Sequence, residues 1–214
     1  MFTISQLWKE KMNPITGRLL LTNVMSTTGW AFVNPIFALY VIRNINGADI
    51  KTIGIAYFIY WVIKAVLQLF ISDYLDRLKG EMDDYTALLA GQFLVSLVPF
   101  LLIFTKTPFE LYLVFFLRAI GDAFWVPSWN SLFTRHVNPK RVSFQWALNS
   151  TGFNLGSAVA ILIGSSFALV FGFPTVFVAV TIVQIISFFI LYSLKKHFYK
   201  KVKTPVKYFF AIKS

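Results

Sequence analysis

Cysteine is absent from this chain of 214 residues, and histidine occurs only twice. The missing thiols exclude disulfide bonds, thiol catalysis and cysteine metal sites. Both histidines, His136 and His197, fall in predicted loops, so we expect no metal site and no cofactor. The sequence also has no nucleophile elbow and no metal-binding spacing, and we therefore do not expect an enzyme.

Charged residues are scarce as well. They make up 14% of the chain, whereas soluble domains carry about 25%. Hydrophobic residues make up 57% and are grouped in runs. Six runs have the length of about 20 residues that a bilayer requires, and they cover roughly residues 18–42, 52–74, 85–104, 110–134, 142–171 and 174–194. The sequence predicts an all-α, polytopic membrane protein with six transmembrane helices in a single domain, residues 1–214.

Basic residues are distributed unevenly between the predicted loops. Fifteen of the 20 lie on the side that holds both termini, and three lie in the loops of the other side. Because basic loops stay cytoplasmic, we predict a cytoplasmic N-terminal segment (1–17) and a basic cytoplasmic tail (195–214). The net charge of +11 then reflects orientation and contact with anionic lipid. We expect a multi-pass protein of the plasma membrane, with the lipid bilayer as partner and no nucleic acid.

The two halves of the chain resemble each other. Residues 29–35 (GWAFVNP) match residues 121–127 (GDAFWVP) at an offset of 92 residues, and Gln92 meets Gln184 at the same offset. The matching spans run in opposite directions, which predicts a 3+3 inverted repeat. A second pattern is a row of small residues at every fourth position of the fifth span, which predicts close helix contact. The row consists of Gly152, Gly156, Ala160 and Gly164.

Three ionisable residues fall inside predicted spans, namely Lys64, Arg118 and Asp122. A charge at the bilayer centre costs at least about 2.5–3.5 kcal/mol, so it normally faces a partner or water. One interpretation is a polar pathway that binds substrate or carries a proton. The other is a structural ion pair between the second and fourth spans, with Arg118 reaching toward the surface. Further candidates for the pathway lining, which inter-helix hydrogen bonding or lipid contact would also explain, are Trp30, Asn34, Trp125, Asn149 and Asn154.

The segment 72–84, SDYLDRLKGEMDD, lies between the second and third runs. It resembles the G-x-x-x-D-R-x-G-R-R segment of the major facilitator superfamily, with Asp76-Arg77 as the core and Lys79-Gly80 as a displaced Gly-Arg. The stretch 118–121 (RAIG) is similar to the Arg-x-x-x-Gly start of that superfamily's fourth helix.

This resemblance implies half of a major facilitator fold, namely the N-terminal six-helix half of a twelve-span transporter. It implies a role for Arg118 in substrate binding or proton coupling. It also places Asp76 near the N-terminus of the fifth span of a partner half, where the helix dipole favours a carboxylate. The residues to which it assigns conformational gating are Asp76, Arg77, Lys79 and Gly80.

The resemblance to this superfamily implies a secondary active transporter that moves small solutes by alternating access. Because six spans form one wall of such a pathway, we expect a parallel homodimer in which a second copy supplies the other wall. Two alternatives stay open, a split or truncated transporter that needs another chain and a membrane scaffold without transport. The substrate, a proton or other coupling ion and the direction of transport also stay open.

Overall fold

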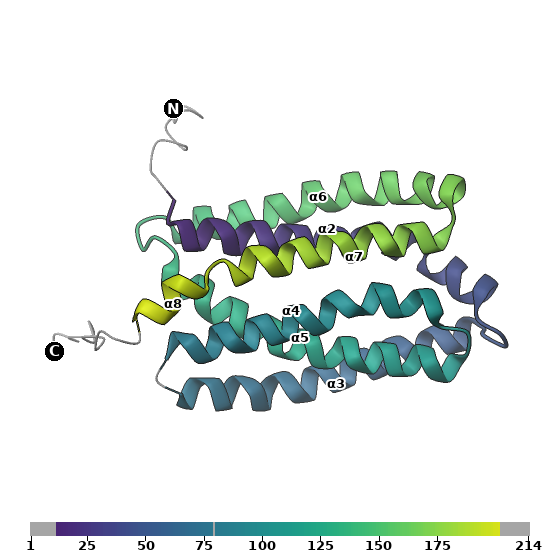
Figure 1. Ribbon diagram of the computed structural model, residues 1–214, viewed down its shortest axis with the longest axis horizontal. Coiled ribbons are helices and arrows are strands. Elements are labelled where there is room, and N and C mark those ends of the chain that lie inside the picture. The colour runs from purple at the N-terminus through teal and green to yellow at the C-terminus, as the bar shows by residue number, and fades with distance from the viewer. Residues whose placement is uncertain (1–11, 79, 202–214) are drawn as a thin grey trace.

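The computed structural model describes residues 12–78 and 80–201. The predicted segment 1–17, the tail 195–214 and Lys79 therefore lie partly or wholly outside the described residues. Within the described ranges the chain is all-α, and six long helices lie side by side (Figure 1). They are α2 (Pro14–Asn44), α3 (Ile50–Arg77), α4 (Glu81–Phe104), α5 (Pro108–His136), α6 (Val142–Phe171) and α7 (Phe173–Tyr192), followed by the short α8 (Lys195–Lys201). The prediction of six helices is confirmed.

Five helical stretches are long and apolar enough to cross a membrane, namely α2, α3, α4, α6 and the stretch Phe173–Phe198. The helix outside this group is α5, which carries Arg118 and Asp122 near its middle. Its length of 29 residues still matches that of its neighbours. α5 packs on both α4 and α3.

Local sequence signals fix the starts of several helices. Asn13 accepts a hydrogen bond from the backbone N–H of Ile15, and Pro14 occupies the first turn of α2. Asp49 is the N-cap of α3 and Thr107 is the N-cap of α5, each with a complete capping box. These caps satisfy backbone N–H groups that a helix start leaves without partners.

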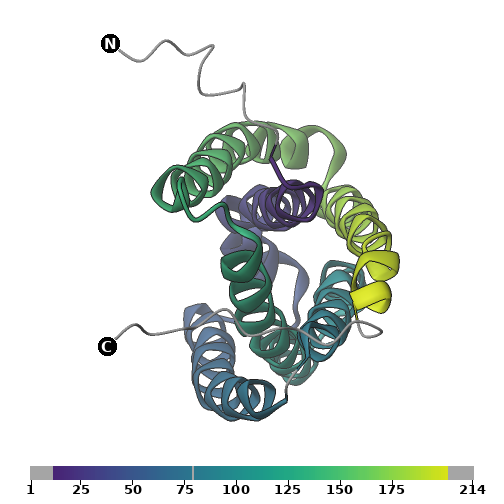
Figure 2. The ribbon, with the colours of Figure 1, turned by 90° about the vertical axis from the view of Figure 1, so that its left-hand side faces the viewer.

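The helices follow one another in space in an order that differs from the sequence. α6 packs on α2, α2 on α7, α7 on α4, α4 on α5, and α5 on α3. Viewed along the helices, they form an open arc with α6 and α3 at its two ends (Figure 2). The two end helices each have a single main neighbour and are the least buried of the spans.

The predicted inverted repeat is visible in the helix bounds and in the packing. The first residues of α3 and α6, Ile50 and Val142, are 92 positions apart, and so are those of α4 and α7, Glu81 and Phe173. The contact of α2 with α6 corresponds to that of α5 with α3. At the centre Gln92 and Gln184, related by the same offset, share a hydrogen bond of 2.9 Å.

The row of small residues on α6 makes the predicted close helix contact, and the structure shows that its partner is α2. A Cβ atom on Gly152 would lie 2.7 Å from the side chain of Val24, and one on Gly164 would lie 2.5 Å from the backbone oxygen of Phe32. A Cβ atom on Gly156 would overlap the hydroxyl of Thr28. The backbones of α6 and α2 therefore approach each other as closely as glycine permits.

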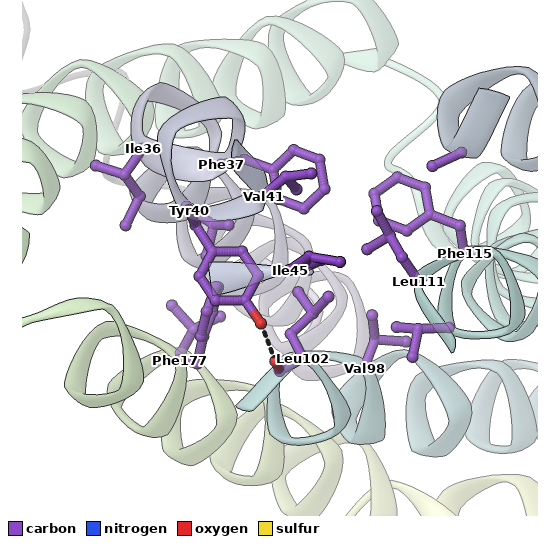
Figure 3. Packing of buried hydrophobic residues seen from close by; sticks show 14 of the residues in the cluster. Ile36, Phe37, Tyr40, Val41, Ile45, Val98, Leu102, Leu111, Phe115 and Phe177 are labelled. Carbon is purple, nitrogen blue, oxygen red and sulfur yellow. Dashed lines mark hydrogen bonds between the residues drawn. The ribbon is translucent and has the colours of Figure 1, made fainter. Parts of the chain in front are cut away.

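Buried apolar side chains form two clusters. One contains Tyr40, whose hydroxyl donates to the backbone oxygen of Leu102, together with Phe37 and Phe177 (Figure 3). The other contains Trp129 and Phe133 with side chains from the starts of α2 and α4, the end of α7 and the middle of α8. Between the residues of the two clusters, α2, α4, α5 and α7 each carry a hydrogen-bonded polar side chain, namely Ser26, Gln92, Trp125 and Gln184. The bundle thus has a polar layer between two apolar layers.

Candidate functional site

The three predicted intramembrane charges lie together, and a tyrosine connects them. The Lys64 Nζ donates to the Tyr60 hydroxyl over 3.3 Å, and that hydroxyl donates to the Asp122 Oδ2 over 2.6 Å. The Arg118 Nε lies 3.9 Å from the same oxygen. We call Tyr60, Lys64, Arg118 and Asp122, together with Trp30, the charged cluster. Its members come from α2, α3 and α5.

Helix periodicity explains how two helices supply four of these residues. Tyr60 and Lys64 are four positions apart on α3, and Arg118 and Asp122 are four apart on α5, so each pair shares one helix face. α3 packs against α5. The Arg118 and Asp122 side chains are 12% and 16% exposed, Tyr60 is buried, and Lys64 is half-buried. The cluster therefore lies at the inner side of α3.

Trp30 joins the cluster from α2. The guanidinium carbon of Arg118 lies 3.5 Å from the centre of the Trp30 ring and 4.8 Å from that of Tyr60. Such contacts between a cation and an aromatic face are attractive, and more so away from water. Among the described residues, the buried Trp30 Nε1 and Arg118 Nε have no hydrogen-bond partner. The cluster holds two cations and one carboxylate.

Trp125, another predicted lining residue, lies in a separate network. Its Nε1 donates to the Gln92 side chain over 2.8 Å. The Gln92 amide donates to the Gln184 side-chain oxygen, and that oxygen also accepts from the Ser26 hydroxyl at 3.0 Å. We call Ser26, Gln92, Trp125 and Gln184 the glutamine clamp. It ties together α2, α4, α5 and α7.

The predicted asparagines lie apart from the charged cluster. The Asn23 amide on α2 donates to the Asn149 side chain on α6 over 2.7 Å. Asn154 is exposed, with its amide 3.5 Å from the Ser150 hydroxyl of the same helix. Asn34 is exposed on α2. Within the described part of the chain, no hydrogen bond connects these side chains to the charged cluster.

The predicted gating residues lie where α3 ends and α4 begins. Asp76 is exposed, and Arg77 forms an ion pair of 2.7 Å with Asp73 one turn earlier. Gly80 precedes the first residue of α4 as its N-cap, and Lys79 lies outside the described residues. Asp76 faces a cavity of about 320 Å³ between α3, α4 and α5. Its polar lining residues are Gln68, Ser72, Asp76, Asp84, Asn130 and Ser131.

A second carboxylate in the lining of this cavity, that of Asp84, is paired. Asp84 accepts from the Arg135 guanidinium at 2.9 Å and from the Ser131 hydroxyl at 3.0 Å. The Asp84 side chain is 3% exposed, whereas that of Arg135 is 39% exposed. Among the described residues, no group of three histidine or carboxylate side chains is placed to hold a metal ion. In the part of the chain that the structure describes, the ion pairs outside the charged cluster lie near helix ends.

Comparisons with known proteins agree with this architecture. The family model of the Major Facilitator Superfamily matches residues 19–212. The multi-drug resistance efflux pump PmrA of Streptococcus pneumoniae, from strains TIGR4 and R6, is 23% identical over 184 residues, which are 82% of this chain and 43% of the pump. A crystal structure of the POT family transporter PepTSo is 14% identical with a TM-score of 0.73, over 88% of this chain and 39% of that chain. The chain thus spans less than half the length of these relatives.

Proposed function

The chain belongs to the major facilitator superfamily, and on this basis we propose that it forms one wall of a pathway that moves small solutes across a membrane. We propose a secondary active mechanism with alternating access. The observation that carries the proposal is the charged cluster, in which Lys64, Tyr60 and Asp122 form a continuous hydrogen-bonded chain. Such a chain suits proton coupling, because the Tyr60 hydroxyl accepts on one side and donates on the other.

The position of Lys64 supports a second six-helix unit. Lys64 is half-buried on α3, an end helix of the arc. A lysine that faces lipid at this depth costs about 2.5–3.5 kcal/mol or more. This cost does not arise when Lys64 faces a water-filled pathway that a second helical unit separates from the lipid. We propose that this second unit lies against the open side of the arc, between its end helices α3 and α6.

We propose a second copy of this chain as that unit. The predicted excess of basic residues on one side orients every copy in the same way, with both termini cytoplasmic, so two copies form a parallel pair. A complementary half from another polypeptide is the alternative. The first test is native mass spectrometry of the protein in lipid nanodiscs. Two copies of the 24.5-kDa chain would support the homodimer, whereas a single copy with a co-purifying chain would support the alternative.

The transport proposal has its own test, which separates it from a scaffold function. Proteoliposomes that contain the protein and a pH-sensitive dye report proton movement when members of a solute panel are added. We expect solute-dependent proton flux, and we expect Asp122→Asn to abolish it while the protein stays folded. If the replacement of Lys64, Arg118 and Asp122 together by apolar residues leaves the cellular function intact, the protein acts as a scaffold.

Gating by the end of α3 is a further part of the proposal. We propose that Asp76, exposed at its cavity, contacts the start of α6 in the partner unit when the pathway is open to the outside. Because the chain has no cysteine, single cysteines can be introduced and labelled without background. Asp76→Asn should then shift the labelling away from the outward-open pattern. Unchanged labelling would remove this part of the proposal.

A further inference from the structure

We propose that the charged cluster binds the anionic head group of an amphipathic organic anion, such as an aromatic carboxylate. The inference deepens the proposed function and rests on it, since it treats the charged cluster as a solute site. It starts from an imbalance between hydrogen-bond donors and acceptors. A guanidinium has five N–H groups and an ammonium three, and neither has an acceptor.

The cluster has many more donors than partners for them. Among the described residues, the buried Nε–H of Arg118 has no hydrogen-bond partner, and Lys64 donates one hydrogen bond, to the Tyr60 hydroxyl. The buried indole N–H of Trp30 has none either. Buried donors without acceptors are costly, and most such groups in proteins have a partner. An incoming carboxylate, which only accepts, supplies the missing acceptors.

The one carboxylate of the cluster, that of Asp122, is already engaged through its Oδ2 atom. The Asp122 Oδ2 accepts the short bond from Tyr60 and lies 3.9 Å from Arg118. It offsets one of the two cations, so the cluster keeps a net charge of +1. A bound monoanion brings the net charge of the site to zero, a neutral solute leaves it at +1, and a monocation raises it to +2. At low dielectric, where charge interactions are strong, this difference favours an anion.

The surroundings of the two cations favour an aromatic body on that anion. The Lys64 Nζ lies 5.4 Å and 5.2 Å from the ring centres of Tyr60 and Trp61. The guanidinium of Arg118 lies over Trp30 and Tyr60 and 6.0 Å from the ring centre of Phe115. An anion that approaches both cations therefore meets aromatic side chains. Offset or edge contacts between rings are favourable.

Three probes with one ring system test the charge preference. They are 2-naphthoate, the neutral 2-naphthamide and the cationic 2-naphthylmethylammonium, titrated calorimetrically into the full chain in nanodiscs, with empty nanodiscs to subtract lipid partition. We expect 2-naphthoate to bind at least about tenfold more tightly than the amide, which is what one charge-assisted hydrogen bond supplies. We expect no saturable binding of the ammonium. Equal affinities for the carboxylate and the amide would overturn the inference.

Two variants locate the binding site. Lys64→Met removes one cation and leaves the bond between Tyr60 and Asp122, and Trp30→Phe removes only the indole N–H and keeps an aromatic ring. Each should weaken 2-naphthoate binding, the first by about tenfold or more, with little effect on the amide. Lys51→Met, in the exposed first turn of the same helix, is the matched control and should bind as the unmodified chain does. Unchanged binding in Lys64→Met, with its melting temperature retained, would refute the site.

Flux through proteoliposomes separates this inference from the proposed function. If 2-naphthoate binds selectively and is not moved across the membrane, the anion site stands and the transport proposal fails. If the protein moves neutral or cationic solutes but not 2-naphthoate, transport stands and the anion inference fails. Movement of 2-naphthoate that is lost in Lys64→Met supports both.

Discussion

Replacement of Gln184 by methionine tests whether the glutamine clamp holds the bundle together. Gln184 is fully buried. Its side chain accepts from the Ser26 hydroxyl at 3.0 Å and the Gln92 amide at 2.9 Å, and it donates to the Ser26 backbone oxygen at 3.1 Å. Methionine has a similar volume and fills the space. The variant therefore loses three inter-helix hydrogen bonds without a large cavity.

The expected loss follows from these three bonds. Side-chain hydrogen bonds between membrane helices average about 0.6 kcal/mol and reach about 1.7 kcal/mol. Gln184→Met should therefore lower the free energy of unfolding by about 2–4 kcal/mol, measured by reversible unfolding in mixed micelles. Gln68→Met, a glutamine on α3 at the Asp76 cavity, is the matched control and should stay within about 0.5 kcal/mol.

A double-mutant cycle with Gln92→Met decides whether the two glutamines act as a pair. In Gln184→Met the Gln92 amide loses its 2.9 Å bond to the Gln184 side chain and keeps only the longer bond of 3.4 Å to the backbone oxygen of residue 184. Removal of the Gln92 amide should therefore cost less than in the unmodified chain. We expect a coupling free energy of about 1 kcal/mol. If the two single losses add to within about 0.3–0.5 kcal/mol, the reasoning about the clamp is wrong.

Three further predictions concern helix contacts and charges. A Cβ on Gly164 would lie 2.5 Å from a backbone oxygen of α2, so Gly164→Ala should cost about 1–3 kcal/mol in unfolding free energy. A Cβ on Gly54 of α3 would meet open space, so Gly54→Ala should be neutral or stabilise by up to about 1 kcal/mol. Equal effects of Gly164→Ala and Gly54→Ala would contradict the close contact of α6 with α2. Arg135→Met leaves the Asp84 carboxylate, 3% exposed, without its ion pair and should cost about 1–3 kcal/mol. Adding Asp84→Asn should recover most of that loss, and no recovery would argue against the pair. The carboxylate of Asp49 accepts hydrogen bonds from the first turn of α3, chiefly from the backbone N–H of Thr52. These bonds hold the pKa of Asp49 below its usual 3.8. The carboxylate of Asp49 therefore stabilises the helix start above about pH 4 and loses this effect as the pH falls through the lowered pKa. The difference in melting temperature between the unmodified chain and Asp49→Asn should shrink below pH 4, and a difference that stays constant to pH 2 would refute the assignment.

Much of the fold could be predicted from the sequence because the relevant signals are local. Run length and caps place six helices, and the small residues of α6 indicate a close helix neighbour. The offset of 92 residues identifies the glutamine pair before its hydrogen bond is known. The sequence also places Lys64 and Asp122 near the middle of their predicted spans, which favours an ion pair between the second and fourth spans.

The rest depends on how the helices are rotated toward one another, which no local pattern fixes. Tyr60 is one aromatic residue in an apolar run, and only the packing of α3 on α5 shows that it connects Lys64 to Asp122. Its position four residues before Lys64 is the one signal that could have identified it. Trp125 has the same residue type as Trp30, yet its indole N–H donates to Gln92 in the glutamine clamp. Residue type alone therefore does not separate the two networks.

The internal repeat bears on whether the charges serve structure or function. The packing of α3 on α5 has a counterpart in that of α6 on α2. At the offset of 92 residues, the counterparts of Lys64, Arg118 and Asp122 are a glycine, a serine and a tryptophan. The α6–α2 contact thus forms without any of these charges, through the close approach of Gly156 and Gly164 to α2. By contrast, the glutamine pair at the centre is present in both repeats. A group that the scaffold requires is expected in both repeats, whereas a group that serves a solute is needed only where the solute binds. The one-sided charged cluster therefore favours the pathway over the structural ion pair.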